Sequence, residues 1–201
     1  MRYTNAFFCG LLGLSLAACS TVDRRIDPDS PDAVGGAALD SQDIRAMADI
    51  MARDIVGRGI LRSSDPSQPV SFYIMGMQNY SSDPIDKAII LTPIRTKLFN
   101  ALPQDQVLVL DRSSATLEEV KAERQAKRSN AVTTNDNLTG GVAGADYVLT
   151  GEIRDRVKQG EDIKSVYYQI TFRITDLETT VLKWTQDYEV KFESEKSVIV
   201  R

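Results

Sequence analysis

The sequence predicts an α+β domain, in which helices pack on a mixed sheet that ends in an antiparallel hairpin. Three helical patterns alternate with two short apolar runs between residues 40 and 129, which is typical of an α/β beginning. Beyond residue 145, apolar and polar residues alternate with a period of two, as in strands with one wet face. A chain of 201 residues suits one domain with a sizeable core, which we expect at residues 39–201.

The first helix is predicted from Asp40 or Ser41, either of which can cap it, to Gly57. Its apolar residues recur at helical spacing, at Ile44, Met47, Ala48, Met51 and Ile55. A methionine stripe can form a promiscuous binding face, but this spacing favours packing in the core.

A buried strand and a helix that contains a proline are predicted next. Residues 70–78 are mostly apolar, which indicates a strand covered on both faces in the middle of the sheet. A helical pattern of apolar residues follows, at Ile85, Ile89, Ile94, Leu98 and Leu102. Pro93 lies inside this pattern and must either kink the helix or begin it, and Thr92 as a cap favours the second alternative.

A short strand and a charged helix come after it. Residues 107–110 are apolar and end at Asp111-Arg112. Thr116 and Glu119 have the spacing of a capping box, which predicts a charged helix through about Ser129. Basic residues of this helix could form a contact face, although interleaved glutamates favour a solvated one; they are Lys121, Arg124 and Arg128.

The last third of the chain is predicted to be antiparallel β-structure. A strand is expected at residues 145–156, entered through the glycine-rich segment 140–144. The next strand places one set of side chains on one face: Val166, Tyr168, Ile170, Phe172 and Ile174. After a turn at residues 176–180, the period of two returns at Leu182, Trp184, Tyr188, Val190 and Phe192.

Composition argues against most enzyme chemistry. The chain has no histidine, which removes the usual triads, zinc ligand sets and the commonest general base. Gly140-Gly141 precedes a strand rather than a helix, so it is not expected to hold a phosphate. Asp111-Arg112 is expected to act as an ion pair or a cap. The net charge of -4 gives no reason to expect nucleic acid. We therefore predict no catalytic site, no metal and no cofactor.

The N-terminus predicts export and a lipid anchor. One basic residue and an apolar run precede Leu16-Ala17-Ala18-Cys19. This apolar run is typical of a secretory signal and is too short to span a bilayer. These four residues resemble the lipobox of bacterial lipoproteins, in which the chain is cut before an acylated cysteine. The resemblance implies a signal peptide at residues 1–18 and a lipid on Cys19; the alternatives are an ordinary cleaved signal or a chance core cysteine. Resemblance to the sorting rule of enteric-type bacteria, in which an aspartate after the cysteine favours the inner membrane, implies that Ser20 directs the protein to the periplasmic face of the outer membrane.

The segment 19–38 is rich in Asp, Pro, Ser and Gly, which predicts a disordered tether. Fully extended, about 20 residues reach roughly 65 to 70 Å. Because Cys9 leaves with the signal and Cys19 is acylated, we expect no disulfide in the exported domain.

The order of motifs resembles the LpoB family of outer-membrane lipoproteins. The matching residues are Gln78-Asn79, Ile94-Arg95 with Leu98, Asp111-Arg112, the stretch from Gly144 to Ile153, Tyr168 and Trp184. The resemblance implies a fold similar to the N-terminal domain of TolB. It also implies a non-enzymatic function, in which the protein binds the accessory domain of a class A penicillin-binding protein and activates this bifunctional synthase. The tether here is shorter than in well-known members.

Partner-contact residues do not carry over from the resemblance one by one. Exposed arginine and tyrosine side chains on a sheet are the types enriched at hot spots, which makes Arg154, Arg156, Tyr167 and Arg173 candidates. An ordinary solvated strand face is the alternative. We expect a monomer.

The chief rival hypothesis is a structural lipoprotein of a secretion or surface-appendage assembly, similar to the curli secretion protein CsgG or the flagellar lipoprotein FlgO. No inserted pair of hairpins long enough for a CsgG-like barrel is visible in the sequence. A hydrolase that works without histidine is a third, weaker alternative.

Overall fold

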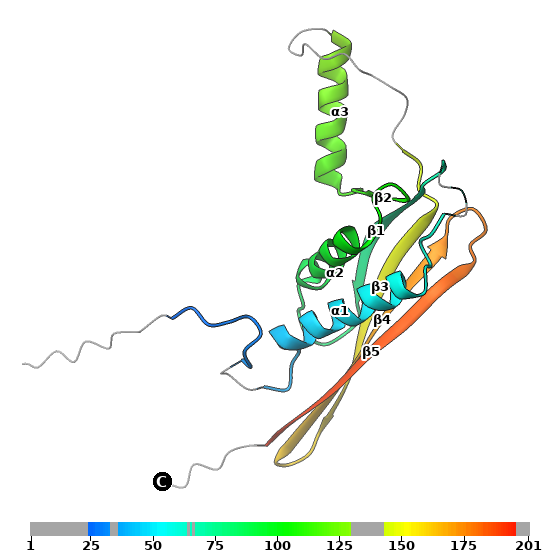
Figure 1. Ribbon diagram of the computed structural model, residues 1–201. Helices are drawn as coiled ribbons and strands as arrows, with labels where there is room; N and C mark the ends of the chain where they lie inside the picture. The colour runs from blue at the N-terminus through cyan, green and yellow to red at the C-terminus, as the bar shows by residue number, and fades with distance from the viewer. Residues whose placement is uncertain (1–23, 33–35, 64, 66, 130–142, 196–201) are drawn as a thin grey trace, which may run out of the picture.

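The computed structural model describes residues 24–32, 36–63, 65, 67–129 and 143–195, and these form one sheet with three helices (Figure 1). The helices are α1 (Ser41–Gly57), α2 (Lys87–Ala101) and α3 (Ser114–Ser129). The strands are β1 (Val70–Asn79), β2 (Val107–Leu110), β3 (Tyr147–Gln159), β4 (Ile163–Asp176) and β5 (Leu182–Glu195). The predicted α+β class is confirmed.

The sheet is mixed, with the strand order β2-β1-β3-β4-β5. β1 runs parallel to both of its neighbours, β2 and β3. β4 pairs antiparallel with β3 along its whole length, and β5 pairs antiparallel with β4. The predicted antiparallel ending is therefore confirmed. The similarity to the TolB N-terminal domain stays a prediction.

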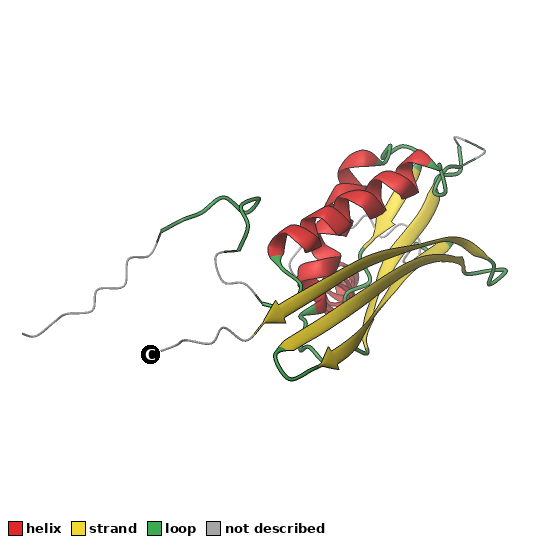
Figure 2. Cartoon of the chain, turned by 90° about the horizontal axis from the view of Figure 1, so that it is seen from below, coloured by secondary structure: helices red, strands yellow, loops and turns green. Residues whose placement is uncertain are grey.

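Helices α1 and α2 lie side by side on one face of the sheet, and Figure 2 shows the opposite face open beneath the strands. The core lies between these two helices and the strands. Its largest fully buried side chains include Met47 and Met51 of α1, Phe72 of β1, and Tyr168 and Phe172 of β4. The methionine stripe of α1 thus packs in the core, as its spacing predicts.

Helix α1 begins where the sequence predicts, because Asp40 and Asp43 form a capping box. The Asp40 carboxylate accepts from the Asp43 N–H at 2.8 Å, and the Asp43 carboxylate accepts from the Asp40 N–H at 3.3 Å. Two aromatic side chains of β5 also bind α1. Trp184 Nε1–H donates to Asp54 at 2.7 Å, and the Tyr188 hydroxyl donates to Asp43 at 3.2 Å.

The expectation that β1 is covered on both faces is wrong. Phe72 is buried under the helices, but Met75 is 63% exposed on the other face. A bulge between Ile74 and Gly76 places Met75 outside the regular pairing with β3, and Gly76 adopts a φ of 137° that favours glycine. Because α1 and α2 share one face of the sheet, no described helix covers the other face of β1.

The prediction that Pro93 begins a helix is also wrong. α2 begins at Lys87, with the Asp86 carboxylate accepting from the Ala88 N–H at 2.9 Å, and Pro93 lies inside the helix. Pro93 therefore removes one intrahelical hydrogen bond. Burial of Ile90 and Ile94 on either side of it offsets this loss.

Two smaller expectations fail for local reasons. α3 begins at Ser114, before Thr116, because the Ser113 hydroxyl accepts from the Thr116 N–H at 3.3 Å. Leu182 is 53% exposed instead of facing the core. The pairing shifts by one residue between Leu182 and Trp184, so that Leu182 lies opposite Thr175 on the open side.

Gly151 fits the sheet because a side chain at its position would meet a buried ring. A Cβ on Gly151 would lie 2.8 Å from Cε1 of Phe172, which is the residue directly opposite it on β4. Phe172 is fully buried. The missing side chain on β3 therefore makes room for the ring on β4.

The described part of the predicted tether contacts the beginning of α1. Asp29 forms an ion pair with Arg45 at 2.5 Å, and the Ser41 hydroxyl donates to Asp32 at 3.2 Å. Both contacts are exposed. The signal peptide, Cys19 and Gly140-Gly141 lie outside the described residues.

Candidate functional site

The open face of the sheet, which we call the outer face, carries all four residues predicted from the sequence to contact a partner. Arg154 and Arg156 of β3 alternate with the buried Ile153, and Tyr167 and Arg173 of β4 alternate with buried neighbours. Arg156 lies directly opposite Tyr167. The alternation thus brings three arginines and a tyrosine, from residues 154 to 173, to one surface.

The outer face divides into two halves. Over β3, β4 and β5, its side chains are polar or charged, and we call this part the charged half. Its members include Glu152, Arg154, Arg156, Tyr167, Gln169, Arg173, Asp187, Glu189 and Lys191. Over β2, β1 and the beginning of β3, the side chains are mostly apolar, and we call this part the apolar half. It contains Tyr73, Met75, Leu108 and Val148.

Within the charged half, Glu152 joins two arginines. Its carboxylate lies 3.0 Å from Arg173 Nη2 and 3.5 Å from Arg154 Nε. The Arg154 guanidinium also lies over the ring of Tyr80, 4.5 Å from the centroid. Stacking and pairing limit the rotamers of Arg154, so that less conformational entropy is lost when a partner binds it.

Tyr167 lies in an acidic part of the charged half. Its hydrogen bond to Glu189 raises the pKa of the Tyr167 hydroxyl, and the nearby charges of Glu189 and Asp187 add to the effect. A tyrosine hydroxyl is protonated at neutral pH even without this shift, so Tyr167 can act as a donor. Arg156 on one side and these carboxylates on the other give the surface alternating charge.

Tyr80 is a member of this surface that the sequence analysis missed. It is 57% exposed and follows β1 directly, and its N–H donates to the Ile153 carbonyl of β3 at 2.9 Å. An aromatic residue in a polar turn is a weak signal. Its contact with Arg154 depends on the position of the loop after β1 beside β3, which no local sequence pattern predicts.

The loop from Tyr80 to Asp86 is fixed by hydrogen bonds to both neighbouring strands. The Ser82 N–H donates to Asp155 of β3 at 2.9 Å, and the hydroxyl of the buried Tyr168 of β4 donates to Asp83. The Asn79 amide donates to the Asp83 carbonyl at 2.8 Å. Tyr80 is thus held by a rigid loop, which positions it against Arg154.

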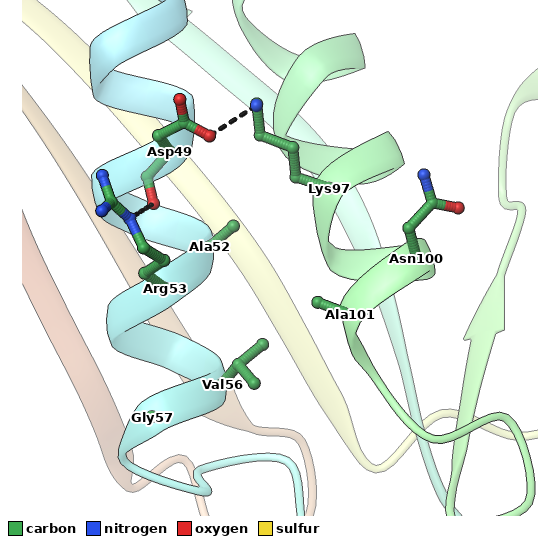
Figure 3. Close-up of a pocket in the computed structure, with 8 residues that line it drawn as sticks. All are labelled: Asp49, Ala52, Arg53, Val56, Gly57, Lys97, Asn100 and Ala101. Carbon is green, nitrogen blue, oxygen red and sulfur yellow. Dashed lines mark hydrogen bonds and ion pairs between the residues drawn. The ribbon is translucent and has the colours of Figure 1, made fainter.

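A cleft of about 460 Å³ lies between α1 and α2, on the side of the molecule opposite the outer face (Figure 3). Asp49 and Lys97 bridge the two helices at 2.5 Å, and this contact lowers the pKa of the Asp49 carboxyl. The Arg53 side chain donates to the Asp49 carbonyl at 3.2 Å. The lining combines small apolar side chains with these paired charges, and contains no nucleophile beside a general base.

Asp111 acts as a cap, as expected. It accepts from the Ser113 N–H at 2.9 Å and from the Thr116 hydroxyl at 2.8 Å, and these bonds lower the pKa of its carboxyl. The described residues contain no group of three or more acidic or cysteine side chains that could bind a metal. No helix within the described ranges has the length and hydropathy to cross a membrane.

The sequence matches the family of the peptidoglycan-synthase activator LpoB over residues 43–190, from the first turn of α1 to the middle of β5. The chain belongs to the LpoB family. This family consists of regulatory activators rather than enzymes. The match includes every described helix and strand, apart from the first two residues of α1 and the last five of β5. It does not favour the alternative of a structural assembly lipoprotein.

Solved structures of LpoB domains are similar to the chain at low identity. The C-terminal domain of LpoB from Salmonella enterica has 14% identity and a TM-score of 0.36, covering 69% of this chain and 94% of that one. The LpoB C-terminal domain from Escherichia coli has 11% identity, a TM-score of 0.37 and the same coverage. The lipoprotein GNA1162 from Neisseria meningitidis has 18% identity and a TM-score of 0.39, covering 63% and 85%. No curated protein matches the sequence. The functional assignment rests on the family match alone.

Proposed function

We propose that this LpoB-family chain is an outer-membrane lipoprotein that binds a class A penicillin-binding protein through the charged half of its outer face and raises the activity of that synthase. The family match over residues 43–190 is the observation that carries the proposal. The lipid on Cys19, the periplasmic position and the class of synthase are expectations from the sequence.

The geometry of the charged half supports its use as the contact surface. Arg154, Arg156, Tyr167 and Arg173 lie on one face, and Tyr80 extends the surface with a second exposed ring. Interface hot spots are enriched in arginine and tyrosine, which combine large contact area with several hydrogen-bond donors. These side chains stand on paired strands, so that the surface is already formed before binding.

Activation by such a surface is a coupling between two equilibria. A ligand that binds the active conformation of a synthase better than the inactive one shifts the population toward the active conformation by the difference in affinity. A tenfold change in the ratio of active to inactive synthase requires a difference in binding free energy of about 1.4 kcal/mol. The expected tether raises the local concentration of the domain near the membrane. No catalytic group is needed on the activator.

The test is polymerisation of lipid II by each class A penicillin-binding protein of the same organism, with and without residues 20–201. We expect one synthase to be accelerated. Replacement of Arg154 and Tyr167 by alanine should raise the half-maximal activating concentration at least tenfold, since hot-spot residues contribute about 2 kcal/mol or more. Arg53→Ala on α1 is the matched control, because Arg53 is an exposed arginine on the opposite side of the molecule.

The outcomes distinguish a failure of the proposed function from a failure of the proposed contact surface. No acceleration of any synthase, with each shown to be active, would contradict the proposed function. Acceleration that survives the Arg154 and Tyr167 substitutions would keep the activator and remove the charged half as its contact surface. Labelling of the full chain with a fatty acid, lost on Cys19→Ala, tests the anchor separately.

A further inference from the structure

No described helix covers the apolar half of the outer face, although the Arg112 side chain lies against Tyr73 there. Phe72 and Ile74 of β1 face the helices, so the residues that alternate with them, such as Tyr73, face outward. Met75 is 63% exposed and Leu108 of β2 is 40% exposed on this side. Val148 of β3, opposite Tyr73, faces the same side but is only 5% exposed, so the exposed apolar area lies mainly at Met75 and Leu108.

The three strands under this surface are parallel, and parallel sheets are normally covered on both faces. α1 and α2 supply one layer only. The charged half differs, since its strands are antiparallel and such sheets tolerate one face in water. The apolar half is therefore where the fold requires a second layer.

Helix α3 packs on no described sheet or helix, so it could supply the layer that the apolar half lacks. It projects from the end of β2 and makes no substantial packing contact with another described helix or strand (Figure 1). An isolated helix of 16 residues is marginal in water, so its stability depends on packing. Leu117 and Val120 lie on one side of α3, and Val120 is 38% exposed.

The side of α3 that carries Leu117 and Val120 also carries basic residues. Lys121, Arg124 and Arg128 line the same surface, while Glu119 and Glu123 lie on the other side at 100° per residue. Long basic side chains can cover apolar surface with their methylene groups while their charges stay in water. This side can therefore lie on an apolar sheet face.

The topology shows which face α3 should cover. The connection from β1 through α2 to β2 moves one way along the sheet, and the connection from β2 through α3 to β3 returns past β1. Crossovers between parallel strands are right-handed in about 98% of cases, so connections that move in opposite directions put their helices on opposite faces. Since α2 lies on the inner face, α3 belongs on the outer face, over the apolar half.

We propose that α3 of one copy covers the apolar half of a second copy, and that the two copies exchange α3 reciprocally. A second copy is favoured over the same chain by the short connection at residues 111–113. Asp111 binds Ser113 and Thr116, and the Arg112 guanidinium lies 6.0 Å from the centre of the Tyr73 ring. These contacts hold α3 directed away from its own sheet. Exchange of an identical element is a common route to dimers.

The dimer departs from the monomer expected from the sequence, and it is compatible with the proposed function. The exchanged helix covers strands β2, β1 and the beginning of β3, whereas Tyr167 and Arg173 lie on β4. Each copy thus keeps its charged half free for a synthase.

The test uses residues 19–201 with Cys19→Ser, a chain without thiols. Met75→Cys and Val120→Cys are made in separate chains, mixed in equal amounts and oxidised mildly. We expect disulfides between the two different variants to exceed those between like variants at least fivefold. Thr171→Cys, on β4 in the charged half, is the matched control and should not crosslink with Val120→Cys. Sedimentation of the thiol-free chain should show a dimer at tens of micromolar.

Three results would overturn the proposal. One is a monomer at 100 μM together with no preference for the mixed disulfide. Another is a disulfide within a single chain carrying both cysteines at nanomolar concentration, which would show that α3 folds back on its own sheet. A third is a dimer that persists unchanged in Leu117→Asp and Val120→Asp. These last two substitutions should leave the unfolding of the body unchanged, because α3 does not contribute to its core.

Discussion

Gly151→Ala offers a sharp test of how β3 and β4 pack. The new Cβ would lie 2.8 Å from Cε1 and 3.0 Å from Cδ1 of Phe172, well inside van der Waals contact. The ring cannot move away freely, because it is fully buried and Met77 Cε lies 3.5 Å from the same Cβ position. Forcing one methyl into a packed core costs about 1–3 kcal/mol. We expect the free energy of unfolding to fall by that amount.

The measurement is urea unfolding followed by the fluorescence of Trp184, the single tryptophan, which is buried between β5 and α1. For a domain of this size, the loss corresponds to roughly 2–4 °C in Tm for each kcal/mol. Gly57→Ala is the matched control, since nothing lies within 4 Å of a Cβ there, and it should change stability by less than about 1 kcal/mol. Equal stability of Gly151→Ala and wild type would refute the argument from close packing.

Three further changes test other contacts. Tyr168→Phe removes the buried hydroxyl that binds Asp83, and should cost about 1.5–3 kcal/mol and speed amide exchange in the loop after β1; unchanged exchange would contradict this role. Asp54 has a lowered pKa, chiefly because Trp184 donates to it, so its contribution to stability is present above pH 3.8 and lost as pH falls through the lower folded pKa. Asp54→Asn should therefore lose less free energy of unfolding than wild type between pH 5 and pH 3, as measured by urea unfolding. If both proteins lose the same amount, the hydrogen bond from Trp184 to Asp54 does not stabilise the fold in this way. Pro93→Ala restores a helical N–H and should raise the free energy of unfolding by roughly 1–3 kcal/mol; a Tm below that of wild type would show that the ring is needed for packing.

The sequence predicts the periodic elements well, because their burial follows their own pattern. α1 and β4 present their apolar residues at spacings of 3.6 and 2, and these residues form the core. Pro93 could not be placed in this way. Its position inside α2 depends on the burial of Ile90 and Ile94, which is a tertiary effect that outweighs the local preference of proline for the first turn.

The candidate site was predictable in part for the same reason. Alternation along β3 and β4 places Arg154 and Tyr167 on one face whichever way the sheet is covered. This face is open, however, because α1 and α2 both pack on the other face of the sheet. No local sequence pattern predicts on which face a helix packs. Tyr80 reaches the surface only because Ser82 and Asp83 bind neighbouring strands, contacts between residues more than 70 positions apart.

The contacts between the predicted tether and α1 limit how far that segment can extend. While Asp29 and Asp32 stay bound to the first turns of α1, only the 10 residues from Ser20 to Asp29 extend from the expected anchor, about 33–36 Å at full extension. When these contacts open, together with the hydrogen bond from the Gln42 side chain to the Asp29 carbonyl, the 21 residues from Ser20 to Asp40 can extend to about 70–75 Å. Exposed ion pairs weaken as salt rises. A higher ionic strength should therefore weaken the Asp29–Arg45 ion pair and lengthen the reach of the segment before α1.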